Sequence, residues 1–83
     1  MNIGHLVQYA LWKNDKTVNW LADQLSMTRA TASAIANDDR KGLIRIDELS
    51  NIFGVSTIEF IKYSEEYDES MNADKRWFGR GKD

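Results

Sequence analysis

The stretch that determines the fold is TVNWLADQLSMTRATASAIAN, residues 17–37. Leu21, Ala22 and Leu25 recur at the spacing of one helix face, which predicts a helix over residues 18–25. Ser-Met-Thr interrupts that pattern, and a further helical segment runs on to about residue 37. Two short helices around a three-residue break predict a helix-turn-helix.

Hydroxyl side chains stand where these two helices begin. Thr17 precedes the first helix and Thr28 precedes the second. A threonine oxygen at this position accepts a hydrogen bond from a backbone N–H that the first helical turn leaves unpaired. Both threonines are therefore predicted N-caps.

Three more helices are expected on either side of this stretch. Apolar spacing predicts them over residues 3–13, 46–53 and 57–66, with a charged loop at residues 38–42. Gly54 suits a left-handed C-terminal cap, and Ser56 with Glu59 forms a capping-box pattern. The last of these helices is expected to bury Ile58, Phe60 (or Ile61) and Tyr63. No segment alternates as a strand does, so we predict an all-α fold of five helices.

The chain divides into a folded part and a polar tail. Residues 1–66 are the predicted helix-turn-helix domain, and residues 67–83 a tail that we expect to be disordered. Residues 1–63 hold seven basic and seven acidic side chains, and residues 64–83 hold four and six. The net charge of −2 therefore comes from the tail.

Composition excludes several classes of function. No apolar run approaches the roughly 20 residues of a membrane span, and no signal peptide is visible at the start, which favours the cytoplasm. The absence of cysteine excludes disulfides and thiolate metal sites. His5 is the only histidine, and Asp38-Asp39 lacks the spaced ligands of a calcium loop. We therefore expect no catalysis, no metal and no cofactor.

Two segments resemble the Cro/C1-type, lambda-repressor-like helix-turn-helix family. Residues 17–37 follow its tendency to read T-Q-x-x-L-A-x-x-L-G-V-S-x-x-T-I-S-x-I-E-N-G, and IDELSNIFGVS (residues 46–56) is similar to its fourth helix and the turn after it. The similarity covers about residues 3–63. It implies a five-helix DNA-binding domain acting in a bacterial cytoplasm, like the small regulators of temperate-phage genetic switches. It also implies a dimer on paired half-sites of double-stranded DNA.

The resemblance further implies which side chains meet DNA, with the helix at residues 28–37 in the major groove. Thr28 and Arg29 would lie at its start, and Arg29 could contact a guanine edge. The residues expected to face the groove are Ala30, Ser33, Ala34 and Asn37. The residues expected to contact the phosphates of the DNA backbone, on either side of this helix in the sequence, are Lys16, Thr17, Arg40 and Lys41.

Departures from the family pattern leave a second interpretation open. Val18 replaces the usual glutamine, and Ser26 replaces the turn glycine, which should cost about 1 kcal/mol if φ is positive. Trp20 occupies a position that is usually polar. An apolar patch of Val18, Trp20, Ala30 and Ala34 would suit an antirepressor that binds the helix-turn-helix of a partner repressor.

Overall fold

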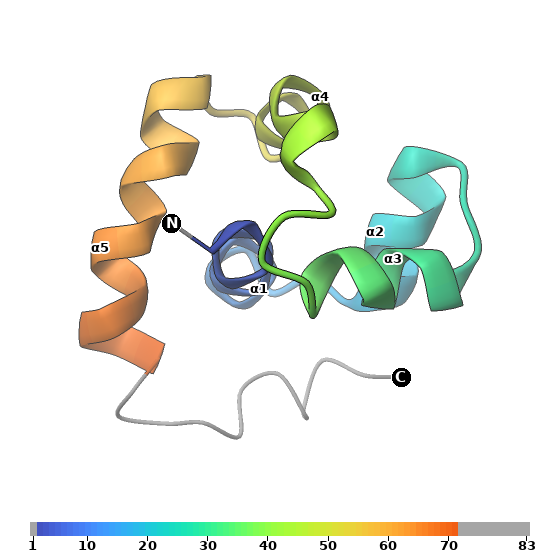
Figure 1. Cartoon of the computed structure of the whole chain (residues 1–83), viewed down its shortest axis with the longest axis horizontal. Helices are drawn as coiled ribbons and strands as arrows, with labels where there is room; N and C mark the ends of the chain where they lie inside the picture. Colours follow the sequence, from blue (N-terminus) through green and yellow to red (C-terminus); the bar gives the residue numbers. More distant parts are fainter. Residues whose placement is uncertain (1, 72–83) are drawn as a thin grey trace.

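The computed structural model describes residues 2–71, with side chains described for residues 2–65. All the regular secondary structure of residues 2–71 is helical, with no β-strand, which confirms the predicted all-α fold of five helices. The helices are α1 (Ile3–Lys13), α2 (Val18–Leu25), α3 (Arg29–Ala36), α4 (Ile46–Ile52) and α5 (Thr57–Met71), with a 3-10 turn, η1 (Leu43–Arg45), before α4 (Figure 1).

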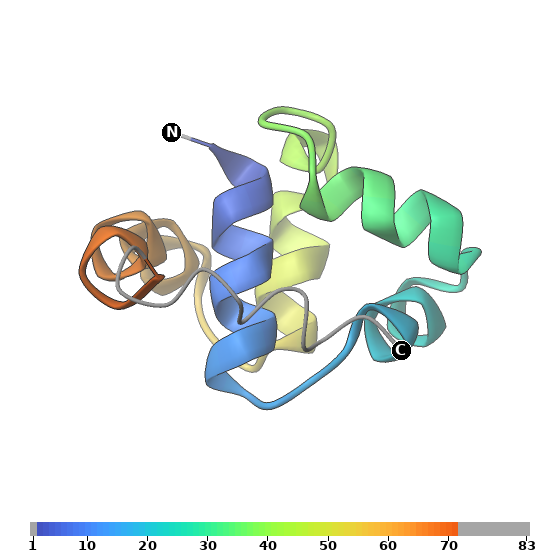
Figure 2. The ribbon, with the colours of Figure 1, turned by 90° about the horizontal axis from the view of Figure 1, so that it is seen from below.

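Helix α1 is the centre of the domain. It packs against α3 and α5, and both views place α5 on one side of it and the α2–α3 pair on the other (Figures 1 and 2). Its apolar face is buried from end to end because the side chains recur every three or four residues. The buried residues of α1 are Ile3, Gly4, Leu6, Val7, Tyr9, Ala10 and Leu11.

A row of aromatic rings connects the two sides of the domain; we call it the aromatic row. Trp20 of α2 lies 5.5 Å from Phe53, measured between ring centroids, and Phe53 lies 6.1 Å from Phe60 of α5. Phe60 is 5.9 Å from Tyr63, which meets Tyr9 of α1 at 5.1 Å with an edge-on ring. Contacts of this geometry add about 0.5–1.5 kcal/mol each to the area they bury.

The turn between α4 and α5 follows its sequence signals. Gly54 has φ +73°, the left-handed value expected of a C-terminal cap. The Ser56 Oγ accepts a hydrogen bond of 3.1 Å from the backbone N–H of Glu59, which is one half of the predicted capping box. The Gly54 cap is confirmed; of the capping box, the Ser56 half is confirmed, and residues 2–65 show no return bond from the Ser56 N–H to the Glu59 carboxylate.

The last helix differs from its prediction in two respects. It continues to Met71 instead of ending near residue 66, so the predicted tail begins inside α5; residues 72–83 lie outside the described residues. Ile58, expected in the core, is 68% exposed. Phe60 is buried, and Ile58 lies two residues before it, about 200° around the helix at 3.6 residues per turn.

Candidate nucleic-acid interface

The α2–α3 unit (residues 17–37) is the candidate interface. Helix α2 is upright and α3 runs across the view in Figure 1, so the two helices cross steeply where they pack. Figure 2, in which α2 is nearly end-on, agrees. Among the helices of residues 2–71, none is both long and apolar enough to cross a bilayer.

Thr17 and Lys16 shape the start of α2. The Thr17 Oγ1 accepts a hydrogen bond of 3.1 Å from the backbone N–H of Trp20, which confirms Thr17 as the N-cap. The Lys16 backbone N–H donates to the Leu11 carbonyl at 2.8 Å, so α1 fixes this entry. The Lys16 ammonium lies 5.3 Å from the centroid of the Trp20 ring, a cation–π distance. The charge of Lys16 is therefore held beside the first turn of α2.

The turn between α2 and α3 is tight and left-handed. Ser26 has φ 55° and ψ 48°, so the positive φ that the family glycine would provide is adopted here by a serine. The Met27 backbone N–H closes the turn on the Ala22 carbonyl at 3.0 Å. A left-handed conformation costs an L-residue about 1–2 kcal/mol, and the closed turn sets the start of α3.

Helix α3 turns one side inward and one side outward. Ala32, Ile35 and Ala36 are buried. On the other side Arg29 and Ala30 are exposed, and Ser33 and Ala34 are half-buried. Ala30, Ser33 and Ala34 therefore lie on the side of α3 away from the buried Ala32 and Ile35, and Arg29 is exposed at the first position of the helix.

Several polar groups of α3 are engaged within the helix itself. Thr28 caps it, accepting from the Thr31 backbone N–H at 3.2 Å, and the two threonine hydroxyls are 3.0 Å apart. The Asn37 Nδ2 donates to the Ser33 carbonyl at 2.8 Å and lies 3.3 Å from the Ser33 Oγ. The Arg29 side chain has no hydrogen bond or ion pair within residues 2–65.

The loop after α3 is held by a carboxylate. The Asp38 Oδ1 accepts from the backbone N–H groups of Arg40 and Lys41, both at 2.8 Å. These hydrogen bonds favour the charged carboxylate and lower the pKa of Asp38 below its ordinary 3.8; the bond from Arg40 has the larger effect, followed by the bond from Lys41. The same bonds hold the backbone of the two expected phosphate-binding residues while their side chains stay exposed.

Helix α1 fixes the C-terminal end of α3, a role that sequence reasoning missed. The Gln8 side-chain amide donates to the carbonyl of Ala36. The first N–H groups of α1 donate to the loop, Ile3 to Asp39 at 2.9 Å and Gly4 to Asp38 at 3.0 Å. The one available signal was Gly4, in the first turn of α1. A glycine inside a helix often marks a place where another part of the backbone comes close.

The two helices of the α2–α3 unit also differ electrically from the two that follow. Neither α2 nor α3 has an acidic residue in its first turn. In contrast, Asp47 and Glu48 begin α4, and Glu59 lies in the first turn of α5. The positive end of a helix dipole attracts anions when no carboxylate neutralises it. The ends of α2 and α3 therefore favour a phosphate more than those of α4 and α5.

One member of the expected apolar patch is buried and another is only partly exposed. Val18 is only 2% exposed, because it continues the buried stripe of Leu21, Ala22 and Leu25 by one turn. Trp20 is half-buried and packs on Phe53. The prediction of an outward-facing Val18 was wrong; Ala30 is exposed, and Trp20 and Ala34 are each half-buried.

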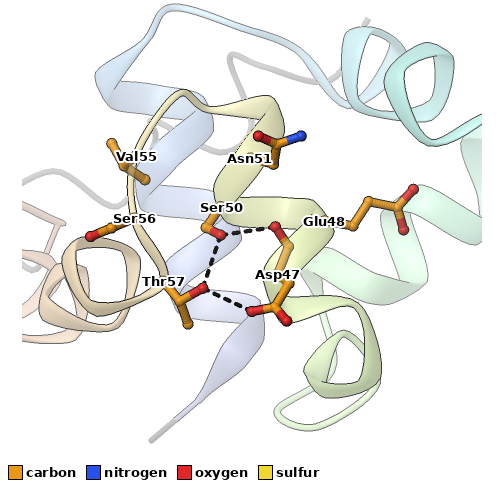
Figure 3. Close-up of a pocket in the computed structure, with 7 residues that line it drawn as sticks. All are labelled: Asp47, Glu48, Ser50, Asn51, Val55, Ser56 and Thr57. Carbon is orange, nitrogen blue, oxygen red and sulfur yellow. Dashed lines mark hydrogen bonds between the residues drawn. The ribbon is translucent and has the colours of Figure 1, made fainter.

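A second surface feature is a hollow of about 550 Å³ between α4 and the start of α5 (Figure 3). The Thr57 Oγ1 donates to the Asp47 Oδ1 at 2.8 Å, and the Ser50 Oγ donates to the Asp47 carbonyl at 2.9 Å. Figure 3 shows Glu48 and Asn51 directed away from this network. The hydroxyl groups thus join α4 to α5, and within the described residues no three His, Cys, Asp or Glu side chains group as a metal site would.

No family model, no curated protein and no solved structure matches this chain.

Proposed function

We propose that this protein is a transcriptional regulator of the Cro/repressor type that binds operator DNA with α3 in the major groove. The observation that carries the proposal is the exposed start of α3, where Arg29 has no hydrogen bond or ion pair within residues 2–65 and the first turn has no acidic residue. Lys16, Arg40 and Lys41 are exposed on either side of it in the sequence. This is the arrangement of one base-contacting helix flanked by phosphate-binding cations.

The net charge of the residues around α3 has the sign that DNA binding requires, but it is small. Residues 13–46 hold six basic and four acidic side chains, a local balance of +2. One of the six, Arg45, is paired with Glu48 at 2.9 Å. Without Arg45, five basic and four acidic side chains remain in this range, and residues 17–42 by themselves hold three of each. Each phosphate contact releases counterions, so the fall of affinity with salt becomes steeper with each cation that contacts DNA.

The proposal includes a dimer on paired half-sites about one helical turn apart. Apolar side chains are exposed on the side of the domain remote from α3: Ile58 is 68% and Ile61 is 36% exposed, both on α5. A second copy meeting that side would leave both α3 helices accessible. Sedimentation of the free protein and the stoichiometry of the DNA complex test this part.

Titration against random duplex DNA at low and moderate salt tests the proposal. We expect affinity that falls steeply with salt. After selection of a preferred site, Arg29→Ala should weaken binding by about 1–3 kcal/mol. Lys62→Ala is the matched control, because it removes one positive charge from an exposed position on α5. Unchanged affinity of the Arg29 variant would refute the role of Arg29, and no DNA binding at low salt would refute the function.

The antirepressor hypothesis is the other outcome of this titration. Burial of Val18 removes it from the apolar docking surface, which leaves the exposed Ala30 together with the half-buried Trp20 and Ala34. The near-neutral charge of residues 1–63 is the observation that still favours it. Absence of DNA binding, together with a complex between this protein and the helix-turn-helix of a repressor, would establish it in place of the first proposal.

A further inference from the structure

The outward side of α3 has few side-chain groups that can identify a base by hydrogen bonding. A bidentate contact from asparagine to adenine needs the amide N–H groups as well as the oxygen. The Asn37 Nδ2 is already 2.8 Å from the Ser33 carbonyl and 3.3 Å from the Ser33 Oγ. The Thr28 hydroxyl accepts from the Thr31 backbone N–H. Thr31 is also exposed, and its hydroxyl lies 3.0 Å from that of Thr28. A hydroxyl serves as donor or acceptor, so none of Thr28, Thr31 and Ser33 selects one base.

What remains on this side is apolar surface and one guanidinium. Ala30 is exposed and Ala34 is half-buried, and they lie four residues apart on the same side of α3. Four residues span about 6 Å along a helix, which is close to two base-pair steps of about 3.4 Å each. Arg29 directly precedes Ala30, and its guanidinium is unpaired within residues 2–65.

Major-groove chemistry offers one apolar partner for such a surface. Thymine is the base that presents a methyl group there, and alanine side chains contact it. Arginine most often contacts the O6 and N7 atoms of guanine. We infer that α3 selects its half-site mainly through thymine methyl groups, at two positions about two base-pair steps apart, next to a single guanine that Arg29 contacts. This inference rests on the proposed function and specifies its ligand.

Replacing thymine with deoxyuridine tests the inference, because it removes the methyl group and keeps every hydrogen-bonding atom. Preferred duplexes are first selected from a random library with the full chain. Each thymine of the selected half-site is then replaced, one at a time. We expect two positions at which affinity falls about fourfold, the equivalent of about 0.8 kcal/mol for one methyl group. Replacements outside the half-site are the control and should have no effect.

Two protein variants assign these losses to side chains. In Ala34→Gly, the ratio of thymine to uracil affinity should approach one at one of the two positions and stay at about four at the other. This ratio is measured within one variant, so a general loss of affinity cancels. In Arg29→Lys, which keeps the charge but removes the planar fork, the preference for guanine should weaken while the thymine-to-uracil ratios are retained.

The outcomes separate the inference from the function on which it rests. Salt-dependent binding with no loss on any thymine replacement, or a selected half-site without thymine, overturns the inference and leaves DNA binding in place. Absence of DNA binding at low salt overturns both.

Discussion

Gly4 occupies the position at which α1 comes closest to the end of α3, and its replacement by alanine tests that contact. A Cβ at residue 4 would lie 2.7 Å from the carbonyl oxygens of both Ala36 and Asp38. Ordinary contact begins at 3.4 Å, so each oxygen would have to move by about 0.7 Å. Both atoms belong to the backbone, so no change of rotamer can relieve the clash.

The size of the effect follows from what must move. Separation of the two segments strains or breaks the hydrogen bonds from Ile3 to Asp39 and from Gly4 to Asp38, each worth about 1 kcal/mol net. Overpacking adds about 1–3 kcal/mol. Alanine regains up to about 1 kcal/mol because glycine is a poor helix former. We expect Gly4→Ala to lower the free energy of unfolding by about 3 kcal/mol, which lowers the Tm by more than about 10 °C.

Urea and thermal unfolding followed by circular dichroism measure this change. Gly54→Ala is the matched control, because a Cβ there meets nothing within 4 Å and only the positive φ opposes it. We expect that control to lose about 1 kcal/mol. A Gly4→Ala protein as stable as the wild type, or no less stable than the Gly54 variant, would refute the close contact between α1 and the end of α3.

Three further predictions concern side chains around the interface. Ser26→Gly should stabilise the fold by about 0.5–1 kcal/mol, since glycine adopts φ 55° without strain; no gain in urea unfolding would show that Ser26 is unstrained. Trp20→Ala should lower stability by about 1.5–3 kcal/mol through lost contact with Phe53, whereas Trp20→Phe should lose less; equal losses would contradict ring packing. Asp38→Asn tests the charge of Asp38. The pKa of Asp38 is lower in the folded protein than its ordinary 3.8, so its carboxylate stabilises the fold fully above pH 3.8. This stabilisation is lost as the pH falls through the pKa of the folded state. The Tm difference between this variant and the wild type should therefore be constant at neutral pH and shrink in acid, and a difference that grows in acid would contradict the assignment.

Local signals were sufficient for most of the helices. The bounds of α1 and α2 agree with their predictions, because apolar spacing and the Thr17 cap act within one turn of the chain. Ser26 adopts the positive φ that its place in the family pattern had left only as a condition. Apolar spacing underestimated α5, since a helix continues one hydrogen bond at a time and needs no apolar face of its own in its final turns.

The error at Val18 and the missed contact of Gln8 have different causes. Val18 was placed on the surface because its family counterpart is polar, yet it extends the buried stripe of α2. The bond from Gln8 to Ala36 joins residues 28 positions apart, so no local pattern could indicate it.

The aromatic row has a consequence for how the domain melts. It begins at Trp20 beside the candidate interface, crosses Phe53 and two rings of α5, and ends on Tyr9 in the central helix. Because every ring packs on the next, neither side can lose its packing and leave the other intact. Near-ultraviolet ellipticity, which reports the rings, and far-ultraviolet ellipticity, which reports the helices, should then give coincident transitions, as one cooperative unit requires.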